Sequence, residues 1–340
     1  MSTGSEHRVV VGAGADRDPS ATTRSTSGRI AAPADRGITT AGGRRHRISR
    51  LEPVTPGMGR GILLSILPGV LLFSLFFVIP LVVVAVTSFT EWGPIRFEFT
   101  GVDNFARLFG DDRFWMALGN TAFFVAAGVL IQVPVGVALA VILSQRIRGW
   151  KILRTIYFLP NIVSYAALSL VYLSVFNPRY GLFNQVLGWF GINSTTDWLF
   201  DVQTALPAVA STWVFTAGVV MILVMAEITA IPQEIFEAAR VEGASRWQVT
   251  RHITLPLLRP VIGSVLTIVA LATLAYFDGV YIMTQGGPAD RTLTLALFAF
   301  QEYSNSDWGY ANTIAFVLLV SGVLVILGIR RTFRVSERDL

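Results

Sequence analysis

The chain lacks cysteine, contains one lysine, and has few charged residues for its length. Of its 340 residues, 14% are charged and 53% are hydrophobic, whereas a soluble domain usually has about 25% charged residues. The low charge argues against an ordinary soluble globule, and the absence of cysteine excludes a disulfide-stabilised scaffold. The hydrophobic content is too high for a disordered chain. The composition therefore indicates a protein that crosses a membrane several times.

Several kinds of chemistry also lack the residues they need. The single lysine, Lys151, follows Trp150 and belongs to no phosphate-binding loop. The three histidines, His7, His46 and His252, are scattered along the chain, which argues against a metal site or a nucleophilic triad. We therefore expect a protein that is not an enzyme and that binds no cofactor or metal. If it moves a solute uphill, the energy must come from an ion gradient or from a partner.

The N-terminal segment differs from the rest in composition. Residues 1–57 are rich in Gly, Ala, Ser, Thr, Arg and Pro and have no hydrophobic period, so we expect a disordered basic cytoplasmic tail. Residues 1–60 carry ten arginines and five acids, which accounts for the net charge of +5. No aromatic residue lies in this segment, so nothing there could stack on bases. We expect no nucleic-acid partner.

Six long uncharged stretches follow the tail. They are 61–90, 114–145, 155–178, 202–226, 260–277 and 308–329. A helix needs about 20 apolar residues to cross the hydrocarbon, and the shortest stretch, 260–277, continues its apolar pattern past Asp278 to Met283. Another uncharged stretch, 180–196, is rich in Gly and Asn, and we expect it to form an interfacial helix. The sequence thus predicts an all-α polytopic membrane protein with six transmembrane helices embedded in the lipid bilayer.

Several prolines lie in or beside the predicted spans. We expect them to be tolerated without marking kinks in the helices. They are Pro68, Pro80, Pro134, Pro160 and Pro207.

The positive residues between the spans predict the orientation of the chain in the membrane. Over alternate connecting segments, arginine and lysine number 22 on one side and 5 on the other. The richer side includes both termini, which are therefore expected to face the cytoplasm.

The segment 231–256, between the fourth and fifth spans, is expected to hold a short cytoplasmic helix. Pro232 suits its first turn, and Glu234 and Glu237 favour its N-terminal half through the helix dipole. Gly243 is placed to end this helix with a left-handed turn.

A second short helix is expected after the glycine. Ser245, followed three residues later by Gln248, has the pattern of a capping box that begins a helix. Pro256 is expected to end that helix before the fifth span. Two helices bent at a glycine would form a compact knob on the cytoplasmic face. The alternative is an ordinary amphipathic connector lying on the lipid surface.

Residues of this segment resemble the signature loop of the membrane subunits of bacterial ABC importers. The matching residues are Glu237, Ala238, Ala239, Gly243, Ile253, Leu255 and Pro256. The resemblance implies that the loop docks into a cleft of a separate ATPase subunit. It also implies that Glu237 makes a polar or ionic contact there, that Gly243 supplies the bend, and that Ala238 and Ala239 allow close approach.

Other segments are similar to segments of the membrane subunits of sugar and glycerol-phosphate importers. They resemble the subunit type that is related to the first membrane subunit of the maltose transporter. The similar segments are 100–105, 112–115, 120–121, 157–160, 177–184 and 281–288. The chain departs from the family at Gln285, where glycine is usual. The resemblance implies a first transmembrane helix and external loop over 61–116. It also implies an ABC importer type-1 transmembrane domain over 117–331.

The resemblance implies a permease subunit in a bacterial inner membrane. Its partners would be a dimer of ABC ATPase subunits that use ATP and Mg, a second related permease, and an extracytoplasmic solute-binding protein. The uncharged spans hold no basic residue, which favours a neutral mono- or oligosaccharide over glycerol phosphate. An ion-coupled secondary sugar carrier, and a membrane scaffold or sensor without transport, are also compatible with six apolar spans. Ionisable groups that could support a proton relay are sparse, namely Asp278 and Glu227.

Polar and aromatic side chains in or near the spans are candidates for a sugar path, because a sugar site needs polar partners and aromatic faces. They are Asn161, Ser164, Tyr165, Trp213, Tyr276, Phe277 and Asp278. Asp278 ranks first, since an ionisable group within a span is by default a hypothesis of function. The structural alternative is that the aromatic residues mark membrane interfaces and that Ser and Asn join helices.

Overall fold

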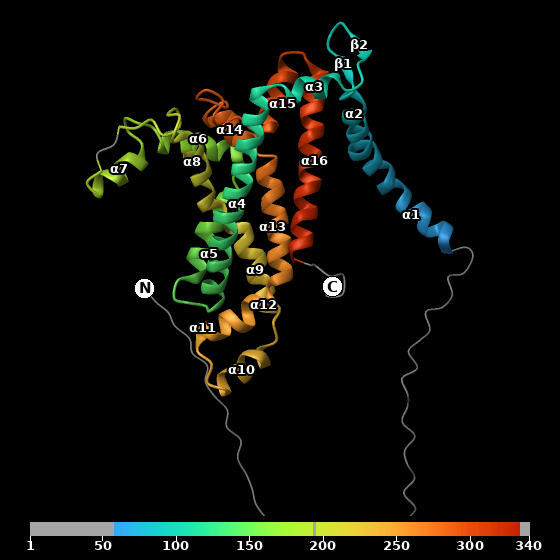
Figure 1. Ribbon diagram of the computed structural model, residues 1–340. Coiled ribbons are helices and arrows are strands. Elements are labelled where there is room, and N and C mark those ends of the chain that lie inside the picture. The colour runs from blue at the N-terminus through green and yellow to red at the C-terminus, as the bar shows by residue number, and fades with distance from the viewer. Residues whose placement is uncertain (1–57, 193–194, 334–340) are drawn as a thin grey trace, which may run out of the picture. The chain divides into compact units, whose positions relative to one another are not determined.

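The computed structural model describes residues 58–192 and 195–333, which are mostly helical (Figure 1). The chain divides into two units, Met1–Gly61 and Ile62–Leu340. Apart from the first turn of one helix, all described elements belong to the second unit. The predicted tail 1–57 lies outside the described residues.

Within the described residues, five helical segments are long and apolar enough to cross a membrane. They are Leu64–Thr87, Asp112–Ser144, Ala205–Ala230, Arg259–Met283 and Trp308–Phe333. Their elements are α1 (Met58–Phe73) and α2 (Ile79–Thr87) joined by a π turn, α4 (Asp112–Ser144), α8 (Ala205–Ser211) and α9 (Gly218–Ala230) joined by a 3₁₀ turn, α13 (Arg259–Leu274) with α14 (Asp278–Met283), and α16 (Trp308–Phe333). They confirm the first, second, fourth, fifth and sixth predicted spans.

The third predicted span, 155–178, is not a straight helix. Trp150–Asn161, which holds α5 (Trp150–Phe158) and a 3₁₀ turn, meets α6 (Tyr165–Val175) at an angle of 103°. Pro160 lies in the 3₁₀ turn and has no N–H to continue the helix. Ser164 then caps a new helix by accepting a hydrogen bond from the Ala167 amide at 3.3 Å.

The expectation that prolines near the spans leave the helices unkinked is therefore wrong for Pro160. The prediction of six spans holds when the bent pair is counted as one crossing. The predicted helix within 180–196 is present as α7 (Leu182–Trp189).

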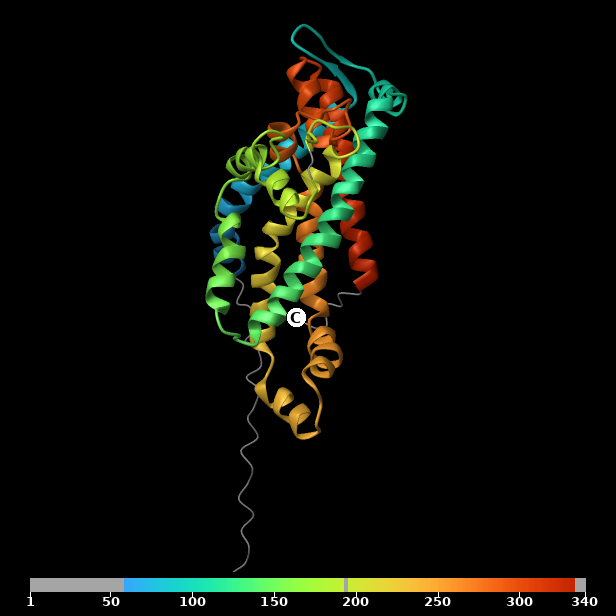
Figure 2. The same cartoon turned by 90° about the vertical axis from the view of Figure 1, so that its left-hand side faces the viewer.

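Short elements connect the spans at both ends. They are the hairpin of β1 (Thr90–Trp92) and β2 (Phe97–Phe99), α3 (Asp103–Phe109), α10 (Gln233–Val241), α11 (Arg246–Val249), α12 (Leu255–Leu257) and α15 (Leu295–Ser304). The hairpin is antiparallel, with Thr90 opposite Phe99. Figures 1 and 2 show α10, α11 and α12 at one end of the long helices, whereas α3, α15 and the hairpin lie at the other end.

Two groups of buried side chains hold the long helices together. α4 packs along α9 and α13, and α13 also packs on α16. The first group includes Phe124, Trp213, Phe298 and Tyr310, each at most 2% exposed. The second group joins α4, α9 and α13 and includes Val133, Val220, Met221, Val224, Leu258 and Val265. Each of these helices buries an apolar side against its neighbours. This packing fixes where the helix ends lie, and therefore where the connecting loops begin.

Glycines on α4 let the neighbouring helices approach closely. A Cβ added at Gly136 would lie 2.5 Å from the Val220 Cβ on α9, and one added at Gly128 would lie 2.5 Å from the Thr273 Cγ2 on α13. Small residues at helix crossings are typical of membrane bundles, because there packing rather than the hydrophobic effect holds helices together.

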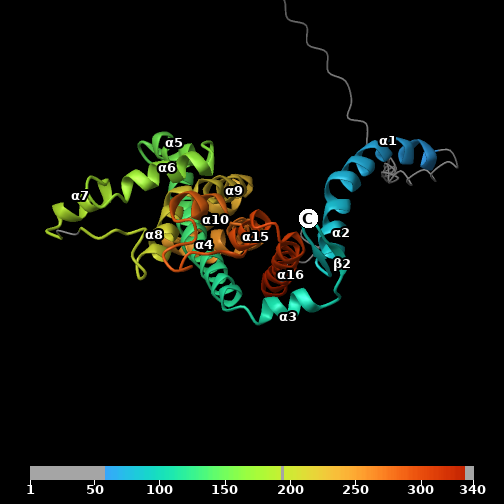
Figure 3. The same cartoon turned by 90° about the horizontal axis from the view of Figure 1, so that it is seen from above.

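The first span contacts the bundle mainly at its end. α2 packs against α16, as Figure 3 shows, and the Asn312 amide donates to the Thr87 hydroxyl at 2.8 Å. None of the most apolar window of Leu64–Thr87 is buried within this chain. The outer faces of this helix are thus available to lipid or to another chain.

An ion pair joins α3 to the start of α16, and a hydrogen bond joins the start of α4 to α16. The Arg107 guanidinium donates to the Asp307 carboxylate at 2.6 Å, and the Tyr310 hydroxyl donates to Asp111 at 3.0 Å. Burial acts to lower the pKa of Arg107, but its hydrogen bond to Asp307 and the negative charge there outweigh burial, so the pKa is raised. We call Arg107, Asp111, Asp307 and Tyr310 the polar clasp.

Candidate functional site

The 231–256 loop has a defined bend. Gly243 has a φ of +79°, a conformation that favours glycine. Its amide donates to the Arg240 carbonyl at 3.0 Å, and the Ala244 amide donates to the Ala239 carbonyl at 3.0 Å. These two bonds form a Schellman motif, which satisfies the last carbonyls of α10. The predicted left-handed helix end at Gly243 is confirmed.

The second helix of the loop begins as the sequence predicts. The Gln248 amide donates to the Ser245 hydroxyl at 3.3 Å, and the Ser245 amide donates to the Gln248 side-chain oxygen at 2.8 Å. This reciprocal pair is a capping box. Its two bonds fix the direction in which α11 leaves the bend.

The end of that helix differs from the prediction. α11 continues through a π turn, Thr250–Thr254, into α12, so Pro256 does not stop the helical turns. The π turn widens the backbone just before the proline, where the Leu255 amide bonds the carbonyl of Thr250 five residues back. A proline after such a turn is accommodated without ending the run. The break falls instead at Leu258, just before α13.

The seven predicted coupling residues divide by exposure. Glu237, Ala238, Gly243 and Pro256 are exposed, Ile253 and Leu255 are half-buried, and Ala239 is 6% exposed. The loop therefore presents a carboxylate and an alanine on the outside of α10, with the bend beside them.

The two most exposed apolar side chains of the loop were not among the predicted site residues. Val241 is 88% exposed and Trp247 is 68% exposed, one on each side of the Gly243 bend. Exposed apolar groups that gather on a surface are typical of interaction sites. A tryptophan and a valine in a segment otherwise rich in charge were the signal that could have identified them.

Of the candidate sugar-path residues, Trp213 and Tyr276 lie together in the core. Their ring centroids are 5.1 Å apart, and Phe124 lies 5.4 Å from the Trp213 ring. Trp213 is 2% exposed. This arrangement has the edge-to-face geometry of packed aromatic side chains, so within this chain Trp213 is a core residue.

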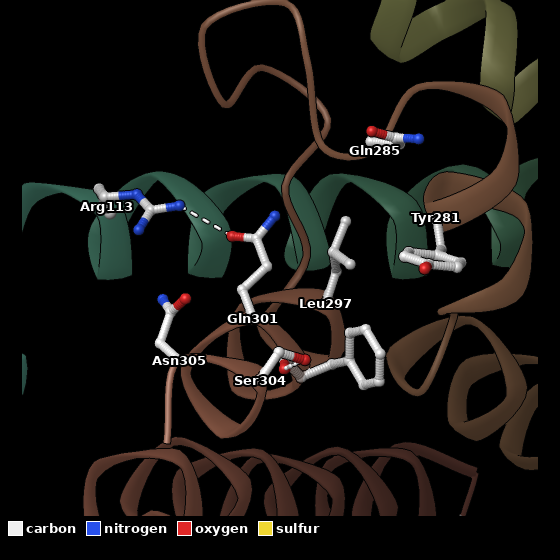
Figure 4. A pocket seen from close by; sticks show the side chains of 8 residues that line it. Arg113, Tyr281, Gln285, Leu297, Gln301, Ser304 and Asn305 are labelled. Atoms are coloured by element: carbon white, nitrogen blue, oxygen red, sulfur yellow. Dashed lines mark hydrogen bonds between the residues drawn. The ribbon is translucent and has the colours of Figure 1, made fainter. Parts of the chain in front are cut away.

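Phe277 belongs to a different aromatic group. Its ring stacks on Tyr281 at 5.2 Å and meets Phe300 edge-on at 5.0 Å. Tyr281 and Phe300 were not among the predicted residues. Both are partly exposed, and both border a hollow beside α15 (Figure 4).

The remaining candidates are dispersed. The Asn161 amide donates to the Tyr157 carbonyl at 3.1 Å and lies against Gly218 of α9. Tyr165 is 48% exposed at the start of α6, and Asp278 is exposed at the start of α14. α6 and α14 pack on each other, so these two residues lie on neighbouring elements, while Ser164 serves as a helix cap. The structure does not gather the seven residues into one site.

The sequence has relatives among membrane transport proteins. The chain is 31% identical over 277 residues to the probable ABC transporter permease protein YurN of Bacillus subtilis, covering 79% of this chain and 94% of YurN. It is 34% identical over 238 residues to the trehalose/maltose transport system permease protein MalF of Thermococcus litoralis, covering 68% of this chain and 80% of MalF.

The fold also has a solved counterpart. A bacterial alginate ABC transporter, crystallised in complex with an alginate pentasaccharide-bound periplasmic protein, has a chain similar to this one with a TM-score of 0.71 and 23% identity. The similarity covers 82% of this chain and 96% of that one. Residues 132–334 match the family described as binding-protein-dependent transport system inner membrane component. This match and the permease relatives show that the chain belongs to this family of membrane-embedded ABC importer permeases.

Proposed function

We propose that this chain is the permease subunit of an ATP-driven importer that moves a neutral mono- or oligosaccharide into the cytoplasm. The observation that carries the proposal is the bent loop at one end of the bundle, which exposes Glu237 and Ala238 beside the Gly243 bend. Family membership and the trehalose/maltose permease among the relatives support it. The chain itself catalyses no reaction and would bind no cofactor; ATP and Mg would be used by a partner ATPase.

The loop is proposed to couple ATP binding to the pore. Its residues Glu237, Ala238, Ala239, Gly243, Ile253, Leu255 and Pro256 would dock into a cleft of the ATPase subunit. α12 is separated from α13 by Leu258 alone, and Leu258 is fully buried in the second core group. A push on the loop would therefore be carried to α13 and its neighbours as a rigid movement rather than absorbed by a flexible linker.

The partners follow from this role. We propose a dimer of ABC ATPase subunits at the loop end of the bundle and a second related permease beside this chain. A solute-binding protein would act at the opposite end. The loop and both termini would face the cytoplasm, and the helices would lie in the bacterial plasma membrane.

A neutral solute fits the charge balance at the end opposite the loop. Arg113, at the start of α4, donates to Asp290 at 3.0 Å and lies 3.5 Å from Glu302. Its positive charge is thus already balanced by two carboxylates and is not left free for a phosphate. Glycerol phosphate remains the alternative solute, and its transport in place of sugars would contradict the neutral assignment.

Charge reversal on the loop tests the coupling. In an importer reconstituted with its partner subunits, Glu237→Lys and Gly243→Asp are expected to lower ATP-driven uptake about tenfold or more, since reversing or crowding a docked contact costs several kcal/mol. Glu98→Lys is the control, because Glu98 is also an exposed glutamate but lies on β2 at the other end. Uptake and ATPase activity would be measured together, with membrane insertion checked for each variant.

Unchanged uptake in both loop variants would contradict the coupling role. Uptake by the isolated chain under a proton or sodium gradient would favour the secondary carrier instead. Stable isolation without partners and without uptake in any assembly would favour a scaffold.

A further inference from the structure

A hollow of about 440 Å³ lies at the end of the bundle opposite the 231–256 loop, among residues at the start of α4, on α14 and on α15 (Figure 4). Pockets that hold small ligands usually have about 300–1,000 Å³. The hollow lies outside the residues assigned to the loop and to the predicted sugar path.

One residue of the hollow occupies an unusual backbone conformation. Gln285 has a φ of +52° and is followed by Gly286 at +88°. A positive φ is easy for glycine and uncommon for a residue with a Cβ. Gln285 thus contributes a side chain at a position where glycine would fit with less strain, and Figure 4 shows that side chain at the hollow.

A second amide is held in a fixed orientation. The Arg113 guanidinium donates to the Gln301 side-chain oxygen at 2.9 Å, so the amide nitrogen of Gln301 is left as a donor. Figure 4 shows this bond at the edge of the hollow. The amide of Asn305, at the end of α15, lines the same space. Amides from different parts of the chain therefore border one hollow.

Aromatic rings complete the wall. Tyr281 and Phe300 line the hollow with ring centroids 5.4 Å apart, and they are 43% and 40% exposed. Exposed aromatic faces next to amide donors and acceptors suit a sugar, which has apolar ring faces and hydroxyl edges. Among the residues that line the hollow, the charged one is Arg113, and its positive charge is already balanced by Asp290 and Glu302.

We propose that this hollow is an outer subsite for a neutral saccharide and that Gln285 determines its specificity by hydrogen bonding to sugar hydroxyls. The proposal rests on the proposed function, because it assigns part of the solute's route to this chain. The solute would contact the subsite before it enters the bundle.

The test uses the full chain in lipid nanodiscs free of maltoside detergent, whose head group would compete. Saturation-transfer NMR would measure the Kd for maltose and lactose, with glycerol 3-phosphate as the anionic comparison. We expect at least one of the disaccharides to bind and glycerol 3-phosphate not to bind. Gln285→Gly is expected to raise the Kd about three- to tenfold, the effect of one lost hydrogen bond.

The same variant separates binding from folding. Gln285→Gly relieves the positive φ, so its melting temperature should stay unchanged or rise while its affinity falls. Gln285→Asn keeps an amide in a residue that tolerates this conformation and is expected to retain most of the affinity. Gln203→Gly is the control, because Gln203 is an exposed glutamine of the turn before α8, away from the hollow. Its Kd should match the wild type.

An unchanged Kd in Gln285→Gly would overturn the subsite, and so would a loss of affinity that is matched by a fall in melting temperature. A variant that impairs only stimulation by a solute-binding protein, with the sugar Kd intact, would assign the hollow to a protein contact and overturn it too. If the assembled importer takes up sugar normally while these variants have no effect, only the subsite fails. If no ATP-dependent sugar uptake exists, the proposed function fails and the subsite fails with it.

Discussion

Trp213 and Asp278 were both predicted as candidates for the sugar path, but the structure places them in different surroundings. Trp213 is 2% exposed between Phe124 and Tyr276. Trp213→Ala is therefore expected to lower the free energy of unfolding in detergent by about 3–5 kcal/mol through the cavity it leaves. Trp213→Phe, which keeps an aromatic ring, should lose less. Thermal unfolding of the purified variants measures both.

Asp278→Ala serves as the contrasting substitution. Because Asp278 is exposed at the start of α14, its removal should leave the melting temperature near that of the wild type. If Asp278 lies on the solute route, the KM for uptake rises while stability is unchanged. Normal uptake kinetics would remove it from the candidates.

At the scale of helices, the packing of α4 against α9 depends on a glycine. A Cβ at Gly136 would lie 2.5 Å from the Val220 Cβ and 3.0 Å from the Ala217 carbonyl oxygen. Gly136→Ala should therefore destabilise the protein by about 1–3 kcal/mol, since the helices must separate.

Gly119 provides the matched control on the same helix. An added Cβ there meets nothing within 4 Å, so Gly119→Ala should gain about 0.5–1 kcal/mol from the better helix propensity of alanine. Opposite changes in melting temperature are expected for the two variants. Equal changes would mean that helix propensity, and not the close approach to α9, governs the effect at Gly136.

At the scale of the whole described molecule, the polar clasp joins residues 200 positions apart, Arg107 and Asp307. Their side chains are 56% and 32% exposed, so the pair should contribute about 0.2–1 kcal/mol. Asp307→Arg is expected to lower stability at low salt, and adding Arg107→Asp should recover part of the loss. Recovery stays partial, because Asp307 also accepts from the Tyr310 amide at 3.3 Å.

The coupling energy between Arg107 and Asp307 is measured by unfolding the wild type, the two single variants Asp307→Arg and Arg107→Asp, and the double variant, each at low and high salt. The coupling energy should shrink as salt screens the exposed charges. A coupling energy of zero at low salt would mean that the polar clasp orients α3 and α16 without adding to the free energy of unfolding.

Most of the helices follow from the sequence, for local reasons. A long uncharged apolar run must satisfy its backbone within itself, which makes a helix, and five predicted spans agree with the structure. The bend at Gly243 and the cap at Ser245 also depend on residues within a few positions. Local spacing was therefore enough to predict the bend of the loop and the start of α11, whereas the seven coupling residues rest on the resemblance to ABC importers.

Other features depend on contacts between distant segments. The burial of Trp213 beside Tyr276 and the hollow bordered by Gln285 and Gln301 arise from segments that meet only in the folded chain. The 103° bend after Asn161 and the continuation of helical turns past Pro256 have local causes, the 3₁₀ turn at Pro160 and the π turn Thr250–Thr254, but hydropathy alone does not reveal them. Hydropathy and local spacing determined which segments are helical and where the loop turns, because both are set by neighbours in sequence. Which side chains face each other was decided by the packing of the bundle, because no local pattern specifies partners nearly two hundred residues away.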